Sequence, residues 1–178
     1  PLPYGIDFHP VDGSVWYSKL NAGKIGRVNP KTLEVKEWDS PREGPRRLRF
    51  SKDGTLWIPS FVEGALMSFD TVSEQFKSYP LPTFEDALIE TPYALNIHPK
   101  TQNVWITGGL SDRLIEFSPK TRKFKAYPLP TLVTFMREVE FLHEEDVCSS
   151  YANLPAHAIE GGTPKVVCLK TGQSETKD

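Results

Sequence analysis

Residues 91–130 decide the fold of this chain, and they read TPYALNIHPKTQNVWITGGLSDRLIEFSPKTRKFKAYPLP. The segments between their apolar runs are rich in Gly, Pro, Ser, Thr and Asn, which favour turns. The runs themselves have the length of strands, and they are Ala94–Ile97, Val104–Ile106, Leu114–Phe117 and Phe124–Tyr127. The stretch therefore predicts a four-stranded antiparallel unit of about 40 residues, the length of one β-propeller blade.

The same unit recurs on both sides of this stretch. Matching runs and turns indicate copies at residues 4–41 and 45–82 and a degenerate fourth copy at 136–171. One position in the second strand recurs in each copy, at intervals of roughly 40 to 50 residues, and aligns the four copies with one another. That position holds Trp16, Trp57, Trp105 and Cys148. Strand-length runs with Gly and Pro between them leave no room for helices, which excludes helical repeats.

The expected fold is an all-β array of β-propeller repeats that forms a single domain over residues 1–178. It would contain about four four-stranded blades, the last one incomplete because no fourth strand follows residue 171. Propellers normally close with about four to eight blades, so we expect an arc or half of a larger ring. Closure with four blades is the alternative, and the missing strand counts against it.

The two ends of such an arc each leave a sheet face without a neighbour. Exposed apolar faces of this kind normally pair. We therefore expect a homo-oligomer, or coverage by a missing remainder of the same polypeptide. The opening Pro-Leu-Pro matches the motifs at 80–82 and 128–130 that close two copies, so we expect it to be the tail of a preceding blade. The chain opens without Met and without a signal peptide, so we expect its native start to be missing.

The composition argues against two classes of partner. The chain contains 21 Lys and Arg against 23 Asp and Glu, a net charge of −2 with both signs interspersed. This balance predicts neither nucleic acid nor an anionic membrane surface as a partner. No apolar run has the length of a membrane-spanning helix, so no membrane insertion is expected.

The residues that open each first strand are the candidate ligand-binding set. In a blade the first strand lines the central channel, so these residues should ring its mouth. They are Tyr4, Arg46, Tyr93 and Arg137. Arginine recognises carboxylates with a planar fork and tyrosine adds a rigid hydroxyl, which predicts a site for a small polar or anionic ligand. In the alternative, Arg46 and Arg137 pair with Glu43 and Glu138 and only hold loops.

Three histidines recur at one phase, just after the first strand, and they are His9, His98 and His143. Their repetition in successive copies, with Pro after two of them, indicates turn chemistry and not a metal or catalytic site. The tryptophans recur in phase as well and should fill the interfaces between blades. No spacing typical of a structural zinc or haem site is present, so no metal site is predicted.

Cys148 and Cys168 fall on neighbouring antiparallel strands of the last copy. A disulfide between them satisfies the geometry of adjacent strands, but the long intervening loop does not set the strand register. Two buried free thiols are the alternative.

The repeat motif resembles the virginiamycin B lyase (streptogramin lyase) family of β-propellers. The matching residues in the first copy are PYGI at 3–6, DGSVWY at 12–17, GKIGRVNPKT at 23–32 and EW at 37–38, and the pattern recurs in the next two copies. The resemblance implies a propeller fold. Active members of the family open the macrocyclic ester of a streptogramin by elimination, with histidine and glutamate side chains and Mg²⁺ near the channel. The last copy is similar to propellers of exported bacterial proteins, which implies a periplasmic or extracellular location.

The sequence departs from the family at the expected site. Pro is followed by Tyr or Arg where the family often has His, so no catalytic residue is carried over by position. If the elimination takes place, His157 with Glu160 or Glu138 would supply the base and the metal ligand, with Mg²⁺ as cofactor. Otherwise no cofactor is expected.

Three functions therefore remain open. The first is a lyase-like module that binds a small ligand at the channel mouth without lyase chemistry. The second is a carbon–oxygen lyase of the streptogramin type. The third is a structural or interaction module that completes a ring with a partner.

Overall fold

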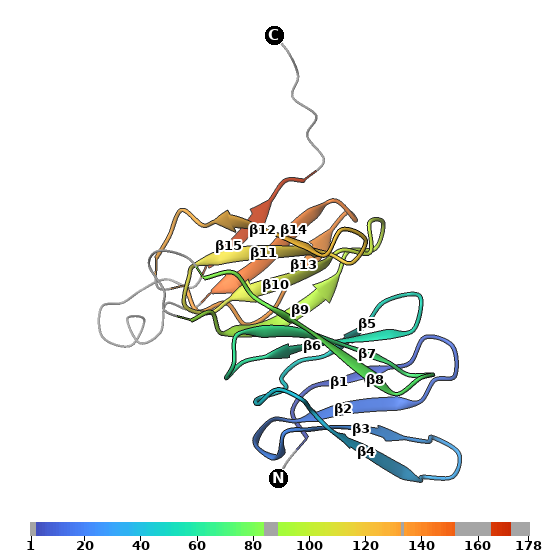
Figure 1. Ribbon diagram of the computed structural model, residues 1–178. Helices are drawn as coiled ribbons and strands as arrows, with labels where there is room; N and C mark the ends of the chain where they lie inside the picture. The colour runs from blue at the N-terminus through green and yellow to red at the C-terminus, as the bar shows by residue number, and fades with distance from the viewer. Residues whose placement is uncertain (1–2, 84–88, 133, 152–164, 172–178) are drawn as a thin grey trace.

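The chain forms an open array of antiparallel sheets (Figure 1), seen in a computed structural model that describes residues 3–83, 89–132, 134–151 and 165–171. The sheets follow one another from the N-terminal to the C-terminal end, and the array does not close on itself. Three described sheets have four strands and the last has three, so the expected propeller array with an incomplete last unit is confirmed. We call the sheets blades 1 to 4.

Each blade is a meander in which consecutive strands pair. Blade 1 contains β1 (Ile6–Phe8), β2 (Val15–Lys19), β3 (Lys24–Val28) and β4 (Val35–Asp39), with the short 3₁₀ helix η1 (Leu20–Ala22) after β2. Blade 2 contains β5 (Arg49–Phe50), β6 (Thr55–Ser60), β7 (Ala65–Asp70) and β8 (Gln75–Pro80). Blade 3 contains β9 (Pro92–Ile97), β10 (Val104–Gly108), β11 (Arg113–Ser118) and β12 (Lys123–Pro128). Blade 4 contains β13 (Glu140–Leu142), β14 (Asp146–Tyr151) and β15 (Lys165–Leu169).

The three tryptophans lie in equivalent interfaces, as predicted from their phase. Trp16 is buried with residues of blade 2 such as Leu56 and Phe69, because alternate residues of β2 face that blade. Trp57 is buried in the next interface with core residues of blade 3, and Trp105 in the third with core residues of blade 4. Each interface is thus a separate aromatic and aliphatic core, and stacking the blades buries what one blade alone would expose.

Two of the repeated histidines shape turns. Nδ1 of His9 accepts hydrogen bonds from the backbone N–H groups of Val11 and Asp12, at 3.4 and 3.3 Å. Nδ1 of His98 accepts equivalent bonds from Lys100 and Thr101, both at 3.2 Å. Accepting these bonds requires an unprotonated Nδ1, and burial lowers the pKa of His98 accordingly. The third, His143, lies exposed in the β13–β14 turn.

Blade 1 and blade 4 have outward faces that no other described blade covers. On blade 1, a row of directly paired apolar residues crosses all four strands: Phe8, Val15, Val28 and Val35. The next row includes Ile6 and Tyr17. On blade 4, the outward positions alternate with the buried Val147 and Ser149, and they include Cys148, Cys168, Ser150 and Val166.

The two cysteines form a disulfide, which settles the alternative that the sequence left open. Cys148 and Cys168 are direct cross-strand partners in β14 and β15, with their Cα atoms 4.1 Å apart. Cys148 also takes the place of the tryptophan, since it pairs with the first strand at Glu140 as Trp105 pairs with Asn96.

Candidate functional site

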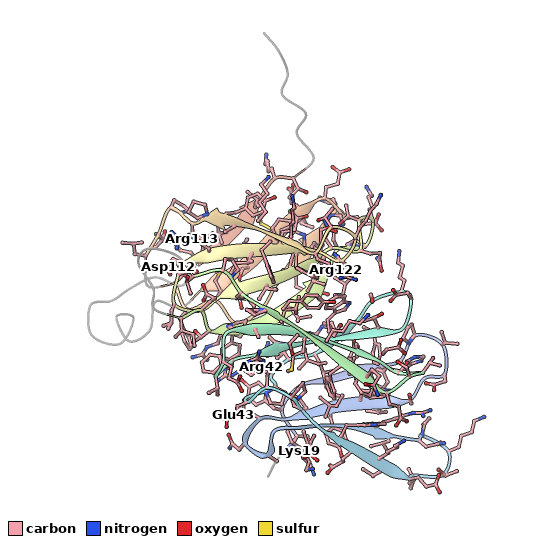
Figure 2. The ribbon with its side chains drawn as sticks, viewed as in Figure 1. Lys19, Arg42, Glu43, Asp112, Arg113 and Arg122 are labelled. Carbon is pink, nitrogen blue, oxygen red and sulfur yellow. A yellow bond between two sulfur atoms is a disulfide. The ribbon has the colours of Figure 1, made fainter. Side chains whose placement is uncertain are left out.

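The loops between blades and the loops from second to third strands lie on one face of the array. In Figure 2, Lys19, Arg42 and Arg113 lie along one side of the molecule, and they belong to these connections or adjoin them. Arg122, which lies in the β11–β12 turn, is on the other side. Among the candidate residues, Tyr4, Arg46 and Arg137 precede the first strands of blades 1, 2 and 4, and Tyr93 is the second residue of β9 in blade 3.

The structure brings the four candidates together. The Tyr4 and Tyr93 hydroxyl oxygens are 2.5 Å apart, although the two residues belong to blades 1 and 3. The Arg46 guanidinium carbon, from the entry to blade 2, is 4.1 Å from the Tyr93 ring centroid. The Arg137 guanidinium carbon, from the entry to blade 4, is 5.9 Å from the same centroid. Tyr93 is therefore the centre of a cluster to which all four blades contribute.

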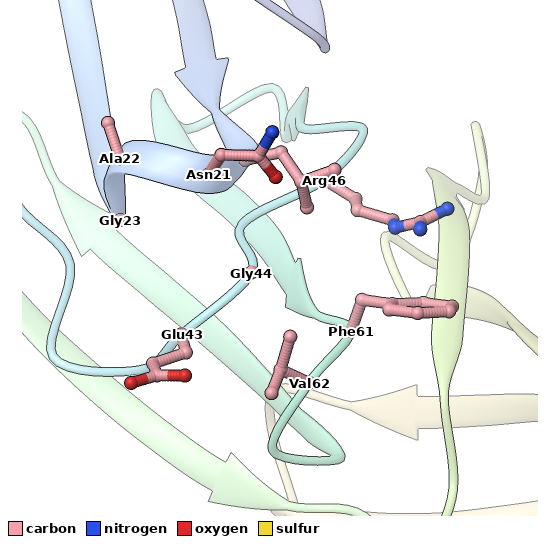
Figure 3. Close-up of a pocket in the computed structure, with 9 residues that line it drawn as sticks. Asn21, Ala22, Gly23, Glu43, Gly44, Arg46, Phe61 and Val62 are labelled. Atoms are coloured by element: carbon pink, nitrogen blue, oxygen red, sulfur yellow. The ribbon is translucent and has the colours of Figure 1, made fainter. Parts of the chain in front are cut away.

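Arg46 is held by aromatic rings and not by a carboxylate. Its guanidinium carbon is 3.5 Å from the centroid of Phe61, which follows β6, and 5.4 Å from that of Tyr4. Figure 3 shows the guanidinium lying over the Phe61 ring. Its Nε and Nη1 atoms are buried, and no hydrogen-bond acceptor for them occurs among the residues that the structure describes. Arginine stacks well on ring faces, but buried N–H groups without acceptors are destabilising by themselves.

The alternative in which the two arginines pair with neighbouring glutamates is wrong. The Glu138 carboxylate forms an ion pair with Arg47, and its Oε1 atom lies 3.7 Å from Nη2 of Arg49. Arg137 instead places its guanidinium carbon 5.1 Å from the Phe135 ring. In the part of the chain that the structure describes, neither Arg46 nor Arg137 makes an ion pair.

The cluster is electropositive, and this changes the acidity of its phenols. Burial raises the pKa of Tyr4, and the hydrogen bond to Tyr93 raises it further. Burial also acts to raise the pKa of Tyr93, but the hydrogen bond with Tyr4 and the nearby arginine charges outweigh it. The net effect lowers the pKa of Tyr93. The surroundings of Tyr93 therefore favour negative charge.

A cavity of about 580 Å³ lies beside Arg46, between blades 1 and 2 (Figure 3). Arg46 and Phe61 belong to both the cavity wall and the aromatic cluster. The rest of the wall comes from η1 and the loops of the same face, and includes Leu20, Asn21, Ala22, Glu43 and Val62. The volume lies in the range of sites for small organic molecules.

The other candidates from the sequence fall into two groups. His157 and Glu160 lie outside the described residues. Glu138 is described, and its carboxylate is already engaged by two arginines. Within the described ranges, no group of three or more His, Cys, Asp or Glu side chains could hold a metal ion.

Sequence reasoning missed Phe61 and Phe135. The repeat phase identifies residues that open first strands, whereas Phe61 lies in a second-to-third-strand loop and Phe135 two residues before Arg137. The available signal for Phe61 was its loop, which lies on the same face as the channel mouth.

Comparisons with known proteins support the fold. No family model matches the sequence, and no curated protein matches it. Solved propellers do match in structure. Virginiamycin B lyase from Staphylococcus aureus has a TM-score of 0.72 at 19% identity, over 83% of this chain and 48% of that one. Hydrazine synthase from Kuenenia stuttgartiensis has 0.78 at 15%, over 94% and 46%. The extracellular domain of a putative one-component system from B. thetaiotaomicron has 0.64 at 20%, over 85% and 19%.

The fold resemblance to virginiamycin B lyase is thus confirmed, and at these identities it concerns the fold alone. The chain spans half or less of each of these three proteins. Their names denote unrelated functions, as expected of a scaffold whose function depends on its site residues. No helix in the described ranges has the length and apolar character needed to cross a membrane.

Proposed function

We propose that this chain is a lyase-like propeller module that binds a small polar or anionic ligand, with a carboxylate as its binding group, at the Tyr93 cluster. One observation carries the proposal: Arg46 has two buried N–H groups without an acceptor among the residues that the structure describes. A buried donor left unpaired is destabilising by about 1–3 kcal/mol. A carboxylate beside Arg46 would supply acceptors and compensate the charge that no described carboxylate neutralises.

The surroundings favour an acid with a flat or apolar body. Phe61 and the cavity wall residues Leu20 and Val62 offer apolar surface next to Arg46. Arg137 and the paired hydroxyls of Tyr4 and Tyr93 offer further polar contacts. A ligand such as an aromatic carboxylate would place its acid group between the arginines and its ring in the cavity.

The streptogramin-type elimination has less support. It would need a base and a Mg²⁺ ligand near the channel, and Glu138 is the described residue that was a candidate. Since Arg47 and Arg49 engage its carboxylate, Glu138 does not fit the role of a Mg²⁺ ligand or of a free base.

Titration calorimetry with benzoate, acetate and inorganic phosphate tests the binding proposal. We expect benzoate to bind more tightly than acetate or phosphate, and Arg46→Ala to weaken it about tenfold or more, because a charge-assisted hydrogen bond contributes about 1.5–3 kcal/mol. Arg42→Ala is the matched control, since Arg42 lies on the same face but is paired with Glu63 at 2.7 Å. Equal effects of the two substitutions, or no carboxylate binding to the wild-type chain, would contradict the proposal.

We further propose that a second copy of this chain covers the outward face of blade 1. Ile6, Phe8 and Val35 are 58%, 61% and 58% exposed there, so the face has the apolar character of a covered interface. Its charged residues already form the pairs Lys19–Glu37 and Lys24–Asp39, so two such faces can meet without like-charge repulsion. The outward face of blade 4 has a disulfide in place of the tryptophan, which favours contact between two blade 1 faces over a head-to-tail ring.

For the location, we propose the periplasm or the extracellular space. The disulfide supports this, because such bonds persist in oxidising compartments. The likeness to an extracellular domain is consistent with it. Fractionation of the native source with an antibody would test it, and recovery in the cytosolic fraction alone would contradict it.

A further inference from the structure

A second site lies at the start of blade 3, around the carboxylate of Glu90. This side chain is 2% exposed. Its Oε1 atom accepts hydrogen bonds from the backbone N–H groups of Thr91 and Leu110, at 2.9 and 3.3 Å. Its Oε2 atom is also buried, but no described residue donates to it. Half of a buried carboxylate therefore has no partner within the described protein.

Two hydroxyls beside it share this property. Thr91 Oγ1 and Ser111 Oγ are buried, and neither has a hydrogen-bond partner in the described ranges. Thr91 precedes β9, whereas Ser111 lies in the β10–β11 loop. Three unsatisfied oxygens from two chain segments thus occur in one small region, although buried polar groups are nearly always satisfied.

Two consecutive glycines lie against these oxygens. A Cβ atom at Gly108 would lie 2.6 Å from Ser111 Oγ and 3.0 Å from Glu90 Oε2. A Cβ atom at Gly109 would lie 2.7 Å from Thr91 Oγ1. Because glycine has no side chain, Gly108 leaves open the space beside Ser111 Oγ and Glu90 Oε2, and Gly109 leaves open the space beside Thr91 Oγ1.

The carboxylate of Glu90 also forms no ion pair with any Lys, Arg or His that the structure describes. The nearby Arg113 guanidinium instead donates a hydrogen bond to the Ser111 carbonyl, at 2.9 Å. The site therefore combines one carboxylate oxygen with two hydroxyl oxygens, and none of the three atoms is nitrogen or sulfur.

We infer that Glu90, Thr91 and Ser111 form a binding site for a hard cation. Oxygen ligands with one carboxylate suit calcium or sodium, whereas zinc and copper sites are built from histidine and cysteine. The cation would complete its shell with water and backbone oxygens. Bound there, it would fix the segment that leads into Tyr93, because the Gly109 N–H already donates to the Thr91 carbonyl at 3.1 Å.

Cation titration of the chelator-treated wild-type chain tests the site. CaCl₂, MgCl₂ and NaCl are added separately at constant ionic strength, and the melting temperature and bound metal are measured. We expect Ca²⁺ or Na⁺ to raise the melting temperature saturably. Glu90→Gln should abolish the increase, and Ser111→Ala should shift its midpoint about tenfold or more to higher cation concentration, since affinity follows ligand number and charge.

Glu63→Gln is the matched control, because Glu63 lies on the same face but pairs with Arg42, and the increase should persist in it. An ordered water is the rival occupant. If water is the occupant, no cation will raise the melting temperature of the wild-type chain more than that of Glu90→Gln, and the inference is overturned. The same increase in both proteins would overturn it as well. Neither result depends on carboxylate binding at Tyr93, so the two sites can fail independently.

Discussion

The outward faces of blade 1 and blade 4 differ, although both end the same repeat array. Blade 1 presents the kind of apolar row that is buried between the other blades, with Phe8 61% exposed. Blade 4 presents a disulfide at the position where blades 1 to 3 place tryptophan. The described part of the array therefore has two chemically different end faces, an apolar one on blade 1 and one with a disulfide on blade 4.

The buried interfaces between blades show how much a covered face contributes to stability. Trp105→Ala, in one of these interfaces, should have the largest effect on the free energy of unfolding. Trp105 is buried between blades 3 and 4, and its removal leaves a cavity that the two sheets cannot fill. We expect the free energy of unfolding to fall by about 3–5 kcal/mol, measured by urea denaturation. The indole N–H has no described partner, so the loss comes from packing alone. Val72→Ala, at a 93% exposed position in the β7–β8 turn, is the control and should change stability by less than about 0.5 kcal/mol. Similar losses in both would mean that the interface around Trp105 contributes no more to stability than an exposed turn.

The disulfide should have the next largest effect. We expect the double substitution Cys148→Ser with Cys168→Ser to reduce the free energy of unfolding by about 2–4 kcal/mol, because the cross-link restricts the unfolded chain. Urea denaturation of the oxidised wild type and the double variant measures this. Adding a reductant should lower the stability of the wild type and leave the variant unchanged. An unchanged wild type on full reduction would show that the blade 4 end does not depend on its cross-link.

The two faces can be compared directly by their effect on association. We expect Phe8→Asp to convert a wild-type dimer to a monomer in light scattering, because a carboxylate would be buried in the apolar contact. Val166→Asp places the same charge on the blade 4 face, at a residue that is 74% exposed, and should leave the dimer intact. A monomeric wild type, or a dimer that only Val166→Asp disrupts, would contradict contact through blade 1.

The blade array could be predicted from sequence because its signals are local and repeated. Turn residues bound each strand run, and Trp16, Trp57 and Trp105 keep the same phase, so one unit explains the others. The candidate cluster could be placed for the same reason, since equivalent positions in a ring converge on its axis.

The partners inside the cluster could not be predicted in this way. Arg47, and not Arg137, forms the ion pair with Glu138, and the Arg46 guanidinium packs on the Phe61 ring. These choices depend on side-chain directions in irregular segments, which carry no periodic signal. The disulfide remained open for a related reason, because the register of β14 and β15 is not determined by a short turn.

The smallest effect should come from titration on the blade 1 face, where Tyr17 donates a hydrogen bond to Glu37 at 2.6 Å. Burial, followed by this hydrogen bond, raises the pKa of Tyr17 to about 12. A folded-state pKa above the unfolded value means that the contribution is present below the ordinary tyrosine pKa and is lost as pH rises through 12. The pKa of Glu37 is lowered, first by its hydrogen bond to Lys19, so its contribution is lost as pH falls through the folded value.

Ultraviolet titration of the wild type and of Tyr17→Phe tests the pKa of Tyr17. The curve of the variant should contain one fewer phenol that titrates at high pH. If the phenol missing from the variant has the ordinary tyrosine pKa in the wild type, the raised pKa of Tyr17 is contradicted and its hydroxyl is open to water. A second copy seated over blade 1 would move the same phenol further upward, and Phe8→Asp should return it toward the value of the uncovered face.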